Sequence, residues 1–116
     1  MKTRSAGEQE QLALMQGTLD VLILRTLVFG PQHGQGIARA IQETSEDVLL
    51  VDHGALYPAL QRLEHQGWIG AKWGVSDQKR RAKYYALTKA GRKQLEKEAA
   101  LWERLAAAVT LVVRAT

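Results

Sequence analysis

The sequence predicts a mainly α-helical protein with one small β-hairpin, that is, an α+β fold. Apolar residues recur at helical spacing in several short segments and in one long C-terminal segment. Between them, residues 68–73 and 82–88 alternate apolar and polar side chains, as half-buried strands do. With 116 residues, of which 46% are hydrophobic, the chain suits one compact domain with its own core.

The N-terminal third predicts three short helices. The run "EQEQLALM" indicates a first helix or arm within residues 1–15. A second helix follows in "GTLDVLILRTLVFG", where a Gly-Pro pair ends an apolar face formed by Leu19, Leu22, Ile23, Thr26 and Leu27. The glycine-punctuated turn "GPQHGQG" then leads to "IARAIQET", in which Ile37 and Ile41 lie one helical turn apart.

The stretch "DHGALYPALQRLEHQGWI" predicts a helix over residues 53–66 whose outward face is unusually small. Leu56, Leu60 and Leu63 cluster on the inward face. Solvent faces ordinarily carry Glu and Lys, yet this one holds small or mildly polar residues: Gly54, Pro58, Gln61 and His65, with Tyr57 and Arg62 at its flanks. Such a face is shaped for contact with another molecule.

The start of this helix has two alternative readings. Asp52 is the expected N-cap, and Gly67 ends the helix. If Asp52 caps it, the N–H missing at Pro58 would have bonded the Gly54 carbonyl, so the first turn is loosened. If the regular helix starts near Tyr57, Pro58 occupies its first position, where no intrahelical bond is expected. Both readings expose a backbone with little side-chain bulk at the N-terminal end.

The two alternating runs, "WIGAKW" and "AKYYALT", predict a two-stranded hairpin joined by the polar, basic loop "GVSDQKRR". We expect Trp68 and Trp73 to be hydrophobic anchors of this hairpin. Because Tyr84 and Tyr85 point to opposite faces of their strand, we expect at least one of them to pack.

The C-terminal segment, from Lys89 onward, predicts a helix of about 25 residues. Its apolar seam repeats every seven positions, with Glu98 as an interruption, and comprises Leu95, Trp102, Leu105, Val109 and Val112. On a monomer this seam would expose an apolar stripe, which soluble proteins avoid. The sequence therefore predicts a homodimer in which the two C-terminal helices pack together.

Positive charge is concentrated in one region of the chain. The net charge is +4, but residues 72–93 carry 8 Lys or Arg and 1 Asp, a local charge of +7. The remaining residues carry 8 basic and 11 acidic side chains, a charge of −3. A basic segment is typical of a protein with a polyanion partner, and a solvated charge run is the alternative reading.

Several classes of protein are excluded by what the sequence lacks. With no Cys there is no disulfide, thiolate metal site or Cys nucleophile, which suits the cytoplasm. The longest apolar run, "VLIL", is too short to span a bilayer, and the first residues lack the apolar core of a signal peptide. His33, His53 and His65 are not at metal-ligand spacing, and no paired carboxylates, nucleophile–base set or phosphate loop is present. We therefore expect no enzyme activity, no metal, no cofactor and no membrane partner.

Helix, turn, helix and basic hairpin in this order predict a winged helix-turn-helix. Its second helix, residues 53–66, would enter a DNA major groove about 12 Å wide, where a bulky N-terminal end would keep base edges away. Gln61 offers a donor and an acceptor to an adenine edge, while Tyr57 and Arg62 reach phosphates from the flanks. The basic loop, residues 74–83, would be the wing.

The same residues resemble the PadR family of bacterial transcriptional regulators, in particular its short, single-domain members. The resemblance runs from about Gln16 to the last residue and rests on "LYPALQRLEHQGWI" followed by "RRAKYYALTKAG", a more specific pairing than one short motif. It implies a winged helix-turn-helix with a C-terminal dimerisation helix, and an operator-binding regulator that acts as a repressor. We accordingly divide the chain into an N-terminal helix or arm (1–15), a DNA-binding domain (16–88) and a dimerisation helix (89–116).

Carried over by position, the resemblance places the candidate DNA-binding residues on the second helix and in the wing: His53, Gly54, Ala55, Tyr57, Pro58, Gln61, Arg62, Lys79, Arg80, Arg81, Lys83 and Tyr84. The sequence departs from the family pattern in three places. Gln35 replaces a frequent aromatic residue, Ala55 replaces a frequent Ser or Thr, and Gln78-Lys79 replaces a tip usually rich in Asn or Gly. Covering the edge of the core is the alternative reading of Tyr57.

The expected partners are double-stranded DNA, at a pseudo-palindromic operator, and a second copy of the chain. Some relatives in the family bind flat aromatic ligands between tryptophans of the dimer helix. Trp102 marks the position for such a small aromatic effector at the dimer interface, although core packing is the favoured reading. The alternative function is a winged-helix module for protein–protein contact without sequence-specific DNA binding, which leaves the basic segment without a role.

Overall fold

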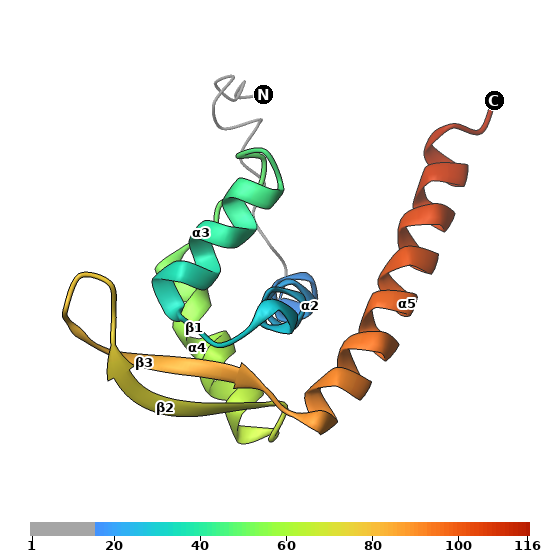
Figure 1. The fold of residues 1–116 in the computed structure, drawn as a ribbon. Coiled ribbons are helices and arrows are strands. Elements are labelled where there is room, and N and C mark those ends of the chain that lie inside the picture. The colour runs from blue at the N-terminus through green and yellow to red at the C-terminus, as the bar shows by residue number, and fades with distance from the viewer. Residues whose placement is uncertain (1–15) are drawn as a thin grey trace.

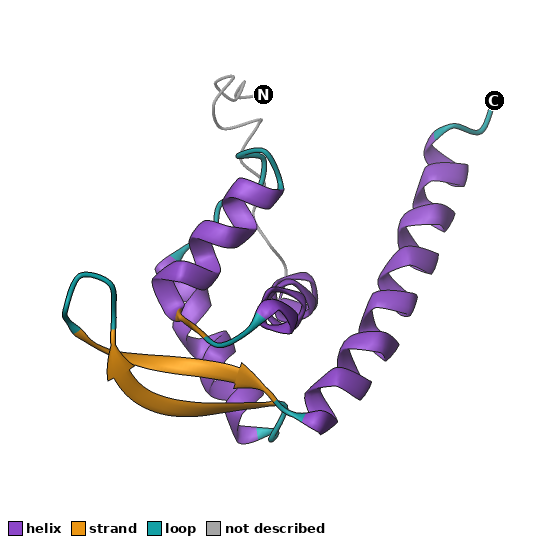
Figure 2. Ribbon diagram, viewed as in Figure 1, coloured by secondary structure: helices purple, strands orange, loops and turns teal. Residues whose placement is uncertain are grey.

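The computed structural model describes residues 16–116, and the helix expected within residues 1–15 lies outside them. Helices, strands and one 3-10 turn follow in the order α2 (Gln16–Thr26), η1 (Leu27–Phe29), β1 (Gln32–His33), α3 (Gly34–Thr44), α4 (His53–His65), β2 (Ile69–Val75), β3 (Arg81–Leu87) and α5 (Lys89–Val113). Figure 1 shows α2 between the α3–α4 pair and the long α5, which rises apart from the other helices. The mainly helical fold class with a small sheet is confirmed (Figure 2).

The core lies where α2, α3 and α4 meet the base of the hairpin. Its fully buried side chains include the predicted inward residues of each helix: Leu19, Ile23, Ile37, Leu56, Leu60 and Leu63. Leu24 is also fully buried, although it lies off the face predicted for its helix. The reason is that α2 is central and contacts α3, α4 and α5, so more than one of its faces is covered.

The sheet has three antiparallel strands in the order β1-β3-β2, so the prediction of a two-stranded hairpin was incomplete. Gln32 and His33 pair with Tyr85 and Tyr84 of β3, within a segment expected to be only a turn. A strand of two residues has no alternation to detect, and it forms because β3 offers a free edge. The same His33 caps α3, because its Nδ1 accepts a hydrogen bond of 3.0 Å from the Gly36 N–H.

The hairpin has one face toward the helices and one away from them. Ala71 and Trp73 of β2 lie directly opposite Tyr85 and Lys83 of β3, and opposed residues share a face. Near the base this face is covered, and Tyr85 is buried, as expected for at least one of the two tyrosines. Farther out the hairpin extends past the core, so Trp73 is 61% exposed and the prediction that it anchors the hairpin was wrong. Trp68 does pack against the core as a partly buried side chain.

Helix α4 begins at His53, which decides between the two readings of its start. The N–H groups of Ala55 and Leu56 bond the Asp52 carbonyl at 3.0 and 2.9 Å, so regular helix is present before Pro58. Pro58 therefore lies inside the helix, and a start near Tyr57 is excluded. Asp52 occupies the N-cap position, but its side chain forms no capping hydrogen bond.

A short joint connects the hairpin to α5. The Thr88 hydroxyl accepts a hydrogen bond from the Gly91 N–H (3.0 Å) and donates one to the Gly67 carbonyl (2.7 Å). The Thr88 N–H in turn donates to the Trp68 carbonyl at 3.1 Å. Gly91 is buried so closely against this carbonyl that a Cβ on it would lie 2.0 Å from the Trp68 oxygen. The first turn of α5 is thereby fixed against the start of β2.

Helix α5 contains 25 residues, as predicted, but its apolar seam divides into two parts. Leu95 is 9% exposed and packs in the core of the protomer itself, so its assignment to the dimer seam is corrected. It follows Gly91 by one turn and still faces α2, which α5 contacts. The remaining seam residues are exposed on the part of α5 that leaves the body: Trp102, Leu105, Val109 and Val112.

Candidate nucleic-acid interface

The outward face of α4 is exposed and carries little bulk. Gly54, Ala55, Pro58 and Gln61 are all exposed, whereas Leu56, Ala59, Leu60 and Leu63 on the other side are buried. His53 stands exposed at the N-terminal end, where the helix dipole is positive. The sequence therefore produces a helix that is fixed by one face and open to close approach on the other.

Tyr57 lies between the two faces, in a position compatible with both roles considered for it, contact with DNA phosphate and cover of the core edge. Its ring packs against the start of α3, since a Cβ placed on Gly34 would lie 3.0 Å from it. The His53 ring stands edge-on to it, with 6.0 Å between the centroids. Tyr57 is nevertheless 44% exposed, so it covers the edge of the core and still presents surface to a partner.

Arg62 is held within the protein. Its Nη2 lies 3.0 Å from Oδ1 of Asp20 on α2, and the Arg62 and Asp20 side chains are 38% and 13% exposed. Burial raises the pKa of Asp20, against the lowering effect of Arg62, and nearby Glu98 raises it further. The ion pair joins α4 to α2, and Arg62 thus has a structural partner in addition to the phosphate contact predicted for it.

Two of the predicted wing residues also have partners within the chain. Lys83 donates a hydrogen bond of 3.1 Å to Oε1 of Glu64, which raises the pKa of Lys83 and connects the wing to α4. The Tyr84 hydroxyl donates to the Val75 carbonyl at 3.3 Å, and its ring lies edge-on to His33. Both side chains hold the wing in place.

The tip of the wing is a compact turn. The Ser76 N–H bonds the Arg80 carbonyl and the Lys79 N–H bonds the Ser76 carbonyl, each at 2.8 Å. Lys79 has a φ of 60°, in the left-handed region that Gly and Asn adopt most easily. A positive φ at this position agrees with the Asn- or Gly-rich tip that the family resemblance implies. Lys79, Arg80 and Arg81 are all exposed.

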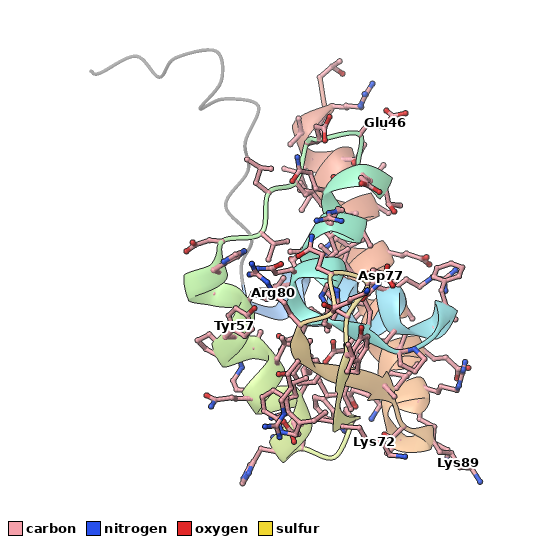
Figure 3. All side chains as sticks on the ribbon, turned by 60° about the vertical axis from the view of Figure 1, so that its left-hand side comes forward. Glu46, Tyr57, Lys72, Asp77, Arg80 and Lys89 are labelled. Carbon is pink, nitrogen blue, oxygen red and sulfur yellow. The ribbon has the colours of Figure 1, made fainter. Side chains whose placement is uncertain are left out.

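A hollow of about 480 Å³ separates the wing from the helices. Its walls combine basic and aromatic side chains, among them Arg39, Tyr57, Trp73, Arg80 and Arg81. Figure 3 shows Tyr57 on α4 and Arg80 on the wing, with Lys72 and Lys89 at the lower end of the view. Only part of the basic segment therefore lines the hollow.

Arg39 is the basic residue that the sequence analysis missed. It is exposed on α3 and lines this hollow as well as a second one, of about 540 Å³, between α3 and the segment before α4. Its signal was weak because it lies far in sequence from the basic run at 72–93. A search for exposed cations on the polar side of the Ile37–Ile41 face would have found it.

Helices α3 and α4 and the basic hairpin of β2 and β3 form a winged helix-turn-helix with a basic wing. Residues 23–97 match the Transcriptional regulator PadR-like family. The chain belongs to this family.

A solved transcriptional regulator from Clostridium thermocellum is 28% identical, with a TM-score of 0.77 over 85% of this chain and 96% of that one. A PadR family transcriptional regulator from Eggerthella lenta is also 28% identical, with a TM-score of 0.72 over 87% and 86% of the two chains. An uncharacterized protein of Lysinibacillus sphaericus is 32% identical over 90 residues, 77% of this chain and 82% of that one.

Membership of the PadR-like family makes the chain a DNA-binding transcriptional regulator and not an enzyme. Within residues 16–116, no group of three His, Asp or Glu side chains is placed to hold a metal ion. None of the helices in this range has the length and hydropathy of a membrane span.

The PadR-like fold brings the predicted residues together in two groups. His53, Gly54, Ala55, Tyr57, Pro58 and Gln61 share the open side of α4, and Lys79, Arg80 and Arg81 lie at the end of the wing. Arg62, Lys83 and Tyr84 form contacts within the chain that support these two surfaces. Gln35, one of the departures from the family pattern, is exposed and lines both hollows.

Proposed function

We propose that this PadR-like regulator is a sequence-specific repressor that binds a pseudo-palindromic operator as a homodimer. Base reading is assigned to the helix predicted over residues 53–66 and attachment to the backbone to the wing, residues 74–83. The observation that carries the proposal is the hollow between them, to which α4 contributes Tyr57 and the wing contributes Arg80 and Arg81. One duplex can therefore touch both elements at once. The repressing role rests on the family resemblance.

The geometry of α4 supports base reading. A helix enters the major groove only if its leading residues let base edges and phosphates come close, and Gly54, Ala55 and Pro58 are exposed and small. Gln61 follows on the same exposed side and is uncharged, so its amide can pair with an adenine edge through one donor and one acceptor. His53 and Tyr57 at the N-terminal end suit phosphate contacts, which fix the position of the helix.

The exposure of α5 supports a homodimer. Trp102, Leu105, Val109 and Val112 lie on one side of the helix and are exposed on a single protomer. Stripes of this kind are rare on soluble monomers and are covered when two copies pack. Residues 16–88 then form the DNA-binding part, and residues 89–116 form the dimerising part. Two copies of α4 would face half-sites about one DNA turn, or a multiple of it, apart.

Trp102 is assigned to packing in this dimer. Trp102 is 47% exposed on the protomer, and a partner helix would cover this exposed part. A flat aromatic effector held between two Trp102 rings is the alternative use of the same surface. Binding of a planar dye, compared between the parent and Trp102→Ala at a protein concentration at which both are dimeric, separates the two uses: loss of dye binding in the variant favours the effector site, and unchanged binding favours packing.

The first experiment is selection of bound duplexes from a random library, followed by binding curves for a selected and a random duplex. Gln61→Ala should cost about 1–3 kcal/mol on the selected duplex and much less on the random one, because only the selected duplex offers a matched base edge. The matched control is His65→Ala, one turn later on the same exposed side and away from the leading end of α4.

Two outcomes would contradict the proposal. If no duplex is enriched in the selection, the alternative of a protein–protein module is favoured. If Gln61→Ala weakens both duplexes equally, α4 positions the protein without reading bases.

A further inference from the structure

The wing carries an aromatic–cation pair that the basic run in the sequence does not reveal. The guanidinium carbon of Arg81 lies 4.6 Å from the centroid of the Trp73 ring, over its face. Because Val75 is the strand partner of Arg81, Arg81 is the diagonal neighbour of Trp73 on the same face of the hairpin. Aromatic and long side chains reach each other across such a diagonal.

Trp73 gains little from burial where it stands. It is 61% exposed, beyond the edge of the core, so packing does not explain a large apolar ring at this position. What the ring does contact is the guanidinium, which it attracts through its π face. A flexible arginine side chain that rests on a flat ring loses much of its rotamer freedom before any ligand arrives.

Arg80 provides the contrast within the same wing. It precedes Arg81 by one residue and lies in the tip turn, where its N–H bonds Ser76 Oγ at 3.3 Å. Its side chain is exposed, and no aromatic ring lies over its guanidinium among residues 16–116. The two arginines look equivalent in sequence, yet only Arg81 is held in a defined orientation.

The pair faces the hollow between the wing and the helices. Trp73 and Arg81 line one wall, while Tyr57 of α4 and Arg39 of α3 line the other. Lys83, on the wing wall, is already paired with Glu64, whereas Arg81 forms no ion pair within residues 16–116. Lys83 is also oriented, by Glu64 and over the Tyr85 ring, so within the described part of the chain Arg81 is the oriented cation without an acidic partner on the side of the wing that looks toward α4.

We propose that Trp73 is a positioning residue that holds Arg81 for a contact with a phosphate of bound DNA. This inference rests on the proposed DNA binding and deepens it, because it assigns the ordered phosphate contact of the wing to one arginine and names the side chain that orders it. Arg80 contributes as a mobile charge. Because Arg81 is already ordered, DNA binding costs less side-chain entropy than it would with a free arginine.

The test is a salt titration of binding to a random duplex, which reports phosphate contacts alone. Arg81→Ala should lower the slope of log K against log salt by about one unit per protomer, hence about two for a dimer. Trp73→Ala removes no charge, so its slope should stay near that of the parent, while K should fall at every salt concentration because ordering Arg81 then costs entropy. The double variant Trp73→Ala, Arg81→Ala should lose no more affinity than Arg81→Ala alone, since the two side chains act as one unit.

Two further variants test the role of the ring itself. Trp73→Phe keeps a π face and should retain most of the affinity of the parent, whereas Trp73→Leu keeps apolar volume without that face and should lose affinity as Trp73→Ala does. Combining Trp73→Ala with Arg80→Ala is the matched control, in which the losses of binding free energy from the two substitutions should add. Thermal unfolding of each variant should stay close to that of the parent, because Trp73 is exposed.

Each remaining result counts against the inference. An unchanged affinity for Trp73→Ala, or additive losses of affinity for Trp73→Ala and Arg81→Ala, would show that the ring does not position Arg81. Equal affinities for Trp73→Phe and Trp73→Leu would assign Trp73 to the shape of the hairpin alone. If the parent protein binds no duplex at all, the proposed function fails and this inference fails with it, an outcome distinct from the others.

Discussion

At the scale of single residues, Asp20 has a consequence for the pH dependence of stability. Burial raises its pKa above the ordinary value of 3.8 despite the ion pair with Arg62. A carboxyl with a raised folded-state pKa contributes stability that is full below about pH 4 and is lost as pH rises through the raised pKa. The difference in free energy of unfolding between the parent and Asp20→Asn should therefore fall as pH increases from about 4 to 7. Urea unfolding at a series of pH values measures it.

Arg62 supplies the control for this titration. Its charge and its hydrogen bond both lower the pKa of Asp20, while Glu98 raises it. In an Arg62→Met background the fall in stability attributable to Asp20 should therefore move to higher pH. A difference that rises with pH would instead mean that the ion pair outweighs burial.

At the scale of elements, the contact of Gly91 with the Trp68 carbonyl should be the most sensitive point of α5. In an open helix position, Gly→Ala stabilises by up to about 1 kcal/mol. At Gly91 the new Cβ would lie 2.0 Å from a backbone oxygen, so α5 must shift from the start of β2. We expect Gly91→Ala to destabilise by about 1–3 kcal/mol or more, measured by denaturant unfolding.

Gly17 is the matched control, since it also lies in the first turn of a helix and a Cβ there meets no atom of the described residues, 16–116, within 4 Å. Gly17→Ala should leave the stability unchanged or raise it slightly. Similar effects at both glycines would mean that the joint tolerates a side chain.

Most elements could be predicted from the sequence, because helical spacing, strand alternation and Gly or Pro boundaries are local signals. Strand β1 could not, since its two residues form a strand only through the edge of β3. The alternation in β2 gave the correct face for Trp73 but not the point where the core ends. Ion pairs were also out of reach: Asp20 and Arg62 lie 42 positions apart, and nothing local in the sequence connects them.

At the scale of the whole molecule, the exposed seam of α5 predicts that Trp102→Ala weakens self-association. The parent should be dimeric at micromolar concentration, and the variant should shift toward monomer and bind operator less tightly through lost avidity. Light scattering coupled to gel filtration gives the molecular mass of each. Leu111→Ala is the control, because Leu111 is exposed on the opposite side of α5 from Trp102. A monomeric parent, or equal shifts for both variants, would place the dimer contact elsewhere.

The joint at Thr88 makes α5 a lever. Its 25 residues span roughly 37 Å at the rise of an α-helix, and its N-terminal part is fixed to the body by the Thr88 joint and the buried Leu95. A rotation of about 5° at one end of such an arm moves the other end by roughly 3 Å. In the proposed dimer the two DNA-binding parts are connected through the two α5 helices. Small rotations at the two joints therefore add to a change in the spacing of the two α4 helices along the DNA axis. The stiffness of this joint, together with the packing of Leu95 on the core, then determines whether both copies of α4 meet the DNA in phase with its helical turn.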